Sequence, residues 1–277
     1  MNESLEQFSP PESGDSEEIK TCCAAVYQSD LARLLLGESF HPGGETLTLR
    51  LGALLQLGPQ SRVLDVASGQ GTSAFLLAQH FGCQVVGIDY GSDAIQRANE
   101  RAQALGLAHL VSFQQGDAER LLLSDATCDA LLCECAFCTF PDKATAAAEF
   151  QRVLKPGGRL GLSDLTRNGD VPEDLQGLLA WIACIADAQP IERYKELLRA
   201  AGLFIETIEP HDEALSELVR EIQGKLLGTE LLVKLKQIEL PATLDLTRAK
   251  ALAKSAATAI RAGQFGYVVL LAAKPES

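Results

Sequence analysis

The stretch that decides the fold is Arg62 to Ala78, RVLDVASGQGTSAFLLA. Its first residues form an apolar run that is typical of a parallel strand covered on both faces. A helical pattern begins at Ala74. Between strand and helix, Gly69 and Gly71 allow a tight turn and a close approach of the backbone to a ligand, and the amides of the helix point toward the same space. The stretch therefore predicts a turn that cradles a nucleotide-like cofactor.

Two classes of cofactor compete for this turn. Gly69 to Ala74 matches the G-x-G-x-x-G/A pattern of dinucleotide sites, and Asp89 ends the next strand, which suits a nicotinamide-dependent oxidoreductase. Asp65 favours a different cofactor, because an unpaired carboxylate inside a buried strand is costly and would repel pyrophosphate. A cationic, amino-acid-like ligand end offsets that cost. S-adenosylmethionine has such an end and no phosphate.

Four motifs follow one another in the chain: DVASGQG at Asp65 to Gly71, VVGIDYG at Val85 to Gly91, QQGDAERL at Gln114 to Leu121, and RVLKPGGRLGLSD at Arg152 to Asp164. In this order they resemble the class I S-adenosylmethionine-dependent methyltransferases. The first motif departs from the usual D-x-G-x-G-x-G by placing Ala67 at the first glycine position. The Pro-Gly of the last motif suits a type II turn and has a structural role only.

The resemblance implies roles for single residues. Asp89 would take both ribose hydroxyls, Asp117 would read the adenine amino group, and Gly69 would lie at the methionine end. Each acid taken alone could also be a polar residue at a strand end. The expected cofactor-binding residues are Asp65, Ala67, Gly69, Gly71, Thr72, Asp89, Tyr90, Asp117, Ala118 and Cys133.

Alternating strand and helix patterns predict an α/β fold with a doubly wound parallel sheet covered by helices on both faces. The resemblance implies seven strands, mostly parallel, in the Rossmann-like arrangement of the class I methyltransferases. Two last strands, Phe204 to Pro210 and Phe265 to Lys274, pair antiparallel at the edge in that family. The other expected strands lie near 62–67, 84–89, 110–115, 128–134 and 158–164, and core helices near 72–81, 92–105 and 142–153.

Composition and the resemblance together predict the domain organisation. Residues 1–18 have low hydrophobicity and are expected to be disordered, and the resemblance implies that residues 19–277 form a single methyltransferase domain. Within it we expect a helical cap over 19–57, a core over 58–210 and 265–277, and a helical insertion over 211–264. The insertion is far longer than a hairpin loop and is interpreted as a lid or a dimer surface. The protein is expected to be a monomer or a homodimer.

Net charge and hydropathy limit the classes of binding partner that we expect. The formal net charge is −13, which repels a nucleic-acid backbone. No apolar run is long enough to span a membrane, and the N-terminus lacks the pattern of a signal peptide. We expect a cytoplasmic enzyme with a small-molecule substrate, and no nucleic-acid or membrane partner.

Eight cysteines stand in a chain with no predicted leader, so reduced thiols are expected. Cys83 and Cys128 begin strands and are interpreted as core residues. The pattern C-x-C-x-x-C could bind zinc, but no second pair of cysteines completes such a site. The remaining cysteines are expected near the cofactor crevice: Cys133, Cys135 and Cys138 after the fourth strand, Cys22 and Cys23 in the cap, and Cys184 after the fifth strand.

Three segments resemble the arsenite methyltransferase branch: CECAFCTFPDK at Cys133 to Lys143, RVLKPGGRLGLSD at Arg152 to Asp164, and CIADAQPIERYKELLRAAG at Cys184 to Gly202. The resemblance implies that Cys184 matches an arsenic-binding thiol and Cys135 the cysteine of the SNC motif. Two other ligand cysteines of that branch have no counterpart here, one of them where Glu38 to Gly43 stand.

A soft lone pair, such as that of trivalent arsenic, selenium or a thiolate, needs little or no general base to attack an activated methyl group. Such a nucleophile fits a site that is rich in cysteine and poor in histidine. The whole chain has only 4 histidines. A hydroxyl or carbon nucleophile would need a base, with Glu134, Tyr27 and His41 as candidates.

The alternatives are an O- or C-methyltransferase related to the quinone branch, and a non-catalytic sensor that binds the cofactor. The expected catalytic residues are Cys184, Cys135 and Glu134; the expected substrate-binding residues are Cys22, Cys23, Tyr27, His41 and Cys138; no resident metal is expected.

Overall fold

The computed structural model describes residues 41–175, 187–235 and 245–276, together with residues 16, 17, 20, 21, 24, 185 and 237. The strands are β1 (Arg62–Val66), β2 (Gln84–Asp89), β3 (Val111–Gln115), β4 (Cys128–Glu134), β5 (Leu154–Arg167), β6 (Phe204–Pro210) and β7 (Phe265–Ala273). The helices are α3 (Gly44–Leu54), α4 (Thr72–Phe81), α5 (Ser92–Ala104), α6 (Lys143–Val153), α8 (Ile191–Ala200), α9 (Asp212–Lys234) and α10 (Leu246–Arg261), with short 3-10 turns η2 (Phe137–Thr139) and η3 (Glu173–Leu175).

The described residues form a seven-stranded sheet in the order β3-β2-β1-β4-β5-β7-β6. The first five strands run parallel, and β7 is antiparallel to both β5 and β6. The predicted doubly wound, mostly parallel sheet is confirmed.

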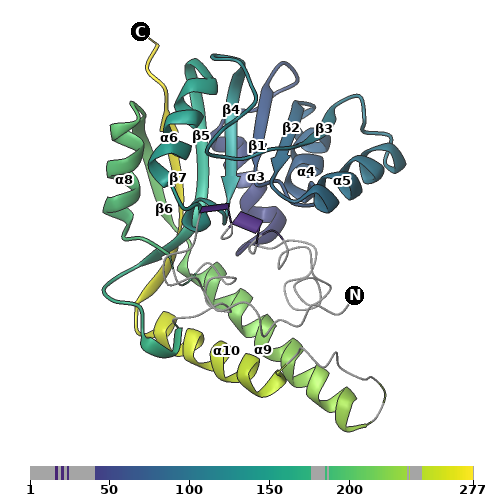
Figure 1. The fold of residues 1–277 in the computed structure, drawn as a ribbon, viewed down its shortest axis with the longest axis vertical. Helices are drawn as coiled ribbons and strands as arrows, with labels where there is room; N and C mark the ends of the chain where they lie inside the picture. Colours follow the sequence, from purple (N-terminus) through teal and green to yellow (C-terminus); the bar gives the residue numbers. More distant parts are fainter. Residues whose placement is uncertain are drawn as a thin grey trace.

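Helices cover both faces of this sheet (Figure 1). The crossovers through α4 and α5 move away from β1 in one direction, and the crossover through α6 moves in the other, so right-handed connections place these helices on opposite faces. Helix α3 packs beside α4, and α8 packs beside α6. Helix α6 begins where the Asp142 side chain accepts a hydrogen bond from the Thr145 N–H, a typical N-cap.

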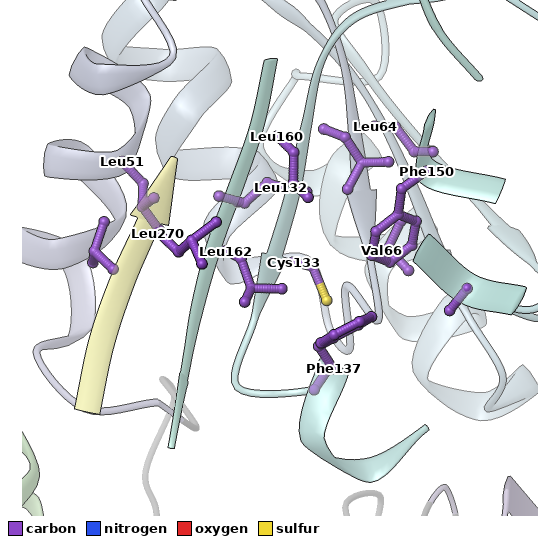
Figure 2. Close-up of a cluster of buried hydrophobic side chains, with 14 of the residues drawn as sticks. Leu51, Leu64, Val66, Leu132, Cys133, Phe137, Phe150, Leu160, Leu162 and Leu270 are labelled. Atoms are coloured by element: carbon purple, nitrogen blue, oxygen red, sulfur yellow. The ribbon is translucent and has the colours of Figure 1, made fainter. Parts of the chain in front are cut away.

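The core lies between the sheet and these helices. Leu132, Leu160 and Leu162 of the central strands are fully buried and lie among other apolar side chains (Figure 2). Burying a leucine side chain of this kind contributes roughly 1.5–3 kcal/mol. The apolar runs of the sequence are therefore explained by strands covered on two sides.

The predicted helical insertion consists of α9 and α10, which pack on each other and lie near the carboxyl ends of the parallel strands (Figure 1). Its first residues are fixed to β7, because the Tyr267 N–H donates to Asp212 Oδ1 at 2.9 Å. Leu227, Leu231 and Leu235 are exposed along α9. The role of the insertion as a lid or dimer surface stays a prediction.

Strand β5 differs most from the prediction, since it runs from Leu154 to Arg167 and not from about 158 to 164. It begins earlier because Leu154 already pairs with Cys128 before the Pro-Gly turn. Gly157 in that turn has a φ of 76°, which favours glycine.

Candidate active site

A pocket opens at the carboxyl ends of β1, β2 and β4, where the strand order reverses. The chain passes from β1 to β2 and β3 on one side of β1, whereas β4 lies on the other side. Ligands of doubly wound sheets bind in the crevice at this reversal. The pocket is lined by residues from these strand ends, from the loops that follow them, and from residues 20, 24 and 41 of the N-terminal region.

The loop after β1 has a backbone that glycine adopts most easily. Ala67, Gly69 and Gly71 have φ values of 59°, 52° and 80°. A Cβ on Gly71 would lie 2.4 Å from Cζ of Phe113, so this glycine lets the ring pack against the loop. Gly69 lines the pocket, and a Cβ there would meet no atom within 4 Å. Gly71 is buried and is not part of the pocket lining, and its role in cofactor binding stays a prediction.

Asp89, at the end of β2, joins two loops. Its Oδ2 accepts a hydrogen bond from the Gly69 N–H and its Oδ1 accepts one from the Gly91 N–H, each at 2.8 Å. Burial raises the pKa of Asp89, and these two donors oppose the rise. Its side chain lines the pocket, so the carboxylate is fixed for hydrogen bonds to a ligand.

Asp65 is an unsatisfied buried carboxylate. It is 3% exposed, and its Oδ2 has no hydrogen-bond partner among the described residues. Burial, together with the charges of Glu134 and Asp89, raises the pKa of Asp65 well above its usual value. Because Asp65 lines the pocket, a cationic ligand group there would relieve an electrostatic cost that a phosphate would increase. The residues present therefore fit S-adenosylmethionine.

Glu134 is the last residue of β4 and is held by hydroxyl groups. Thr48 Oγ1 lies 3.1 and 3.0 Å from the two carboxylate oxygens, and Ser73 Oγ donates to Oε2 at 2.6 Å. His41 Nε2 lies 3.3 Å from Thr48 Oγ1 and 3.6 Å from Glu134 Oε2. We call His41, Thr48, Ser73 and Glu134 the Glu134 cluster. All but Thr48 line the pocket.

Asp117 lies beyond β3, at the other end of the pocket. Its Oδ1 accepts a hydrogen bond from the Glu119 N–H at 2.9 Å, and its Oδ2 accepts one from Lys20 Nζ at 2.7 Å. The Tyr90 hydroxyl donates to Glu17 at 2.7 Å. Two residues of the N-terminal region thus contact the end of the pocket where the resemblance implies adenine.

The cysteines of the C-x-C-x-x-C pattern divide between pocket and core. Cys135 lines the pocket. Cys133 and Cys138 are fully buried, and Cys133 lies beside Leu162 and Phe137 (Figure 2). Burial raises the pKa of the Cys133 thiol well above its usual value, which disfavours the thiolate that would bind a metalloid. We therefore correct the expectation that Cys133 and Cys138 face the crevice.

A change of backbone conformation explains this division. Alternation along β4 turns Cys133 and Glu134 to opposite faces of the sheet. At Cys135 the chain leaves the strand with a φ of 52°, and its N–H donates to the Ser163 carbonyl at 2.7 Å. Cys138 then falls in η2, below the surface of the pocket. Spacing in sequence did not reveal this turn.

Four of the predicted site residues, Cys22, Cys23, Tyr27 and Cys184, lie outside the described residues. The predicted residues that the pocket brings together are His41, Asp65, Ala67, Gly69, Thr72, Asp89, Tyr90, Asp117, Ala118, Glu134 and Cys135.

Sequence analysis missed Lys20, Thr48 and Ser73. Ser73 could have been found, because it stands in the first turn of the helix that follows the glycine loop. Lys20 and Thr48 belong to segments before β1, and no motif in the chain indicates where those segments cross the sheet.

Comparison with known families agrees with this geometry. Residues 57–202, more than half of the chain, match the family model described as a methyltransferase domain. The chain belongs to this methyltransferase family. Its seven-stranded, mostly parallel sheet is the Rossmann-like fold of such domains.

Known relatives of this methyltransferase act on different molecules. An arsenite methyltransferase of Halobacterium salinarum is 32% identical over 165 residues, which are 58% of this chain and 42% of that protein. The 27-O-demethylrifamycin SV methyltransferase of Amycolatopsis mediterranei is 27% identical over 267 residues, which are 90% of this chain and 94% of that protein. This chain thus spans less than half of the arsenite methyltransferase and nearly all of the rifamycin enzyme.

The fold has a solved counterpart in phosphoethanolamine N-methyltransferase 2 of Haemonchus contortus, which was crystallised with S-adenosylhomocysteine. The TM-score is 0.77 at 20% identity, over 93% of this chain and 60% of that chain. This likeness shows the fold alone.

Within residues 41–175, 187–235, 245–276 and the few others described, no helix is long and apolar enough to cross a membrane. The same residues contain no group of three or more His, Cys, Asp and Glu side chains that could hold a metal ion.

Proposed function

We propose that this methyltransferase transfers a methyl group to a small molecule with a soft nucleophile: trivalent arsenic, a related metalloid or a thiol. The observation that carries the proposal is the position of Cys135, which lines the cofactor pocket immediately after β4. Thiolates bind soft partners preferentially. The sequence similarity to an arsenite methyltransferase supports a soft acceptor as well.

Side chains at the carboxyl ends of the strands align the cofactor. Asp89 takes the ribose hydroxyls, Asp117 lies at the adenine, and Asp65 faces the cationic amino-acid end. Bound in this way, S-adenosylmethionine supplies a methyl group that is already activated by its sulfonium. The task of the chain is to hold the acceptor in line with that methyl group and to exclude water.

The wall beside Cys135 suits that task. Ala136, Phe140 and Pro141 line the pocket with apolar surface. An acceptor with a free lone pair, such as trivalent arsenic or the sulfur of a thiolate, needs little or no general base there. Cys184 and one of Cys22 and Cys23 are proposed to complete the soft-ligand site, and all three lie outside the described residues.

A titration tests the soft-ligand site. We would add arsenite to wild type, Cys135→Ser, Cys184→Ser and the matched control Cys138→Ser, and follow the emission of Trp181, the single tryptophan of the chain. A saturable change is expected in wild type and Cys138→Ser, and a weaker or absent one in the other two variants. No saturable change in wild type would contradict the metalloid proposal.

A second candidate, O- or C-methyl transfer to a small molecule, is favoured by the rifamycin relative, which this chain matches over nearly its full length. Such a reaction would need a general base. His41 and Glu134 are the described candidates for it, since both line the pocket.

A further inference from the structure

We propose that Glu134 is a cofactor-binding residue, whose carboxylate receives, together with Asp65, the α-ammonium group of S-adenosylmethionine. Thr48 and Ser73 act as positioning residues that hold the carboxylate for this contact. The proposal concerns the methyl donor and does not depend on the acceptor.

Strand register places the two carboxylates on one face of the sheet. Asp65 of β1 is the Cα partner of Leu132 of β4, and Glu134 follows Leu132 by two residues. Side chains two residues apart on a strand share a face, so Asp65 and Glu134 lie on the same side, one pleat repeat apart. Both line the pocket.

Among the described residues, no Lys or Arg side chain forms a salt bridge with Asp65 or Glu134, and His41 Nε2 lies 3.6 Å from Glu134 Oε2. The side chain of Glu134 is 4% exposed and Asp65 is 3% exposed, yet Oδ2 of Asp65 has no hydrogen-bond partner among the described residues. The charge of Glu134 is one of the causes that raise the pKa of Asp65. A cation between two buried carboxylates offsets their mutual electrostatic repulsion.

The order of groups along the pocket identifies which part of the ligand carries that cation. Asp117 follows β3, Asp89 ends β2, and Asp65 with Glu134 lies on β1 and β4. With adenine at Asp117 and ribose at Asp89, the amino-acid end of the cofactor reaches β1 and β4. Its ammonium is the group that two carboxylates would bind.

The hydrogen bonds of Glu134 fit a fixed anion. Ser73 donates at 2.6 Å to Oε2, and Thr48 Oγ1 lies within 3.1 Å of both oxygens. These hydroxyl groups hold both carboxylate oxygens in place, so the acceptors that an ammonium would bind are fixed. They also fix the rotamer of Glu134 from two helices, α3 and α4.

The test compares two ligands that differ in the amino-acid end. S-adenosylhomocysteine carries the α-ammonium, whereas 5′-methylthioadenosine has the same adenosine and thioether without it. For Glu134→Gln, calorimetry should show that the affinity for S-adenosylhomocysteine falls about ten-fold or more. The affinity for 5′-methylthioadenosine should change less than about two-fold. Asp89→Ala is the matched control, because it should weaken both ligands.

Ser73→Ala is a second variant for the case that Glu134→Gln folds poorly. It should lower the affinity for S-adenosylhomocysteine by a smaller factor and leave the affinity for 5′-methylthioadenosine unchanged. Equal affinities for S-adenosylhomocysteine in wild type and both variants would overturn the proposal. So would an equal loss for both ligands, which would mean that Glu134 acts on the fold of the pocket. Neither ligand contains an acceptor, so failure here is distinct from failure of the soft-acceptor proposal.

Discussion

The backbone N–H of Gly69 donates to Oδ2 of Asp89 at 2.8 Å, which ties the glycine loop after β1 to the end of β2. The same carboxylate accepts the Gly91 N–H through its other oxygen. One side chain thus fixes two loops that border the pocket, and its remaining lone pairs face the ligand.

Replacing this side chain should cost cofactor affinity. Asp89→Ala removes charge-assisted hydrogen bonds, and we expect the binding of S-adenosylhomocysteine to weaken by roughly 1.5–3 kcal/mol. Asp93→Ala is a matched control, because Asp93 is exposed at the start of α5. Calorimetry checks both variants; an unchanged affinity in folded Asp89→Ala would remove this residue from the site.

Asp65 should make stability depend on pH in a direction opposite to that of most carboxylates. Its pKa is raised in the folded state by burial and by the nearby Glu134 and Asp89. Folded protein therefore binds this proton more tightly than unfolded protein. The stability from this group is fully present below the unfolded pKa and is lost as pH rises through the folded pKa.

Asp65→Asn should accordingly stabilise the protein at high pH while weakening S-adenosylhomocysteine binding. We expect a gain on the order of 1–3 kcal/mol, the cost of an unsatisfied buried group, that shrinks as the pH approaches about 4. Urea unfolding at about pH 9 and about pH 5 measures it. A variant less stable than wild type at both values would show that Asp65 has a partner in the folded protein.

Ala67 should be replaceable by glycine with a gain in stability. Its φ of 59° lies in the left-handed region, which costs an alanine roughly 1–2 kcal/mol, and the extra chain entropy of glycine offsets part of the gain. Ala67→Gly should therefore stabilise by about 1 kcal/mol. Ala126→Gly is the matched control, since Ala126 has a φ of 53° and is exposed far from the pocket lining. Thermal unfolding should show a similar rise for both, and a fall for Ala67→Gly would refute the account of the loop.

The sequence predicted the sheet well because its evidence was local. Each apolar run, such as Val63 to Val66, is long enough to mark a buried strand, and the glycine loop marks the reversal in strand order. Asp65, Asp89 and Asp117 stand at fixed places relative to those strands, so their positions at the pocket followed from the same pattern.

The wall of the pocket was less predictable because it depends on tertiary contacts. The turn at Cys135 separates it from Cys133 and Cys138, and a positive φ in a cysteine leaves no mark in the sequence. Thr48 contacts Glu134, and Lys20 lines the pocket and contacts Asp117; both come from segments before β1.

The N-terminal region should become more protected when the pocket is filled. Lys20 Nζ lies 2.7 Å from Asp117 Oδ2, and Glu17 accepts a hydrogen bond from the Tyr90 hydroxyl. Hydrogen exchange with S-adenosylhomocysteine should show slower exchange around residues 16–24 than without it. Tyr90→Phe, which loses the bond to Glu17, should show a smaller effect. Identical exchange with and without ligand would mean that this region does not close over the cofactor.

The central claim, methyl transfer from S-adenosylmethionine to a soft acceptor, is tested most directly by turnover. Wild type would be incubated with the methyl donor and, in parallel, with arsenite, selenite, small thiols and phenols, and methylated products would be identified by mass spectrometry. The account predicts methylated product with at least one of the arsenic, selenium or sulfur acceptors, and a lower rate in Cys135→Ser than in Cys138→Ser. Product from phenols alone would contradict it and would establish the O-methyltransferase in its place.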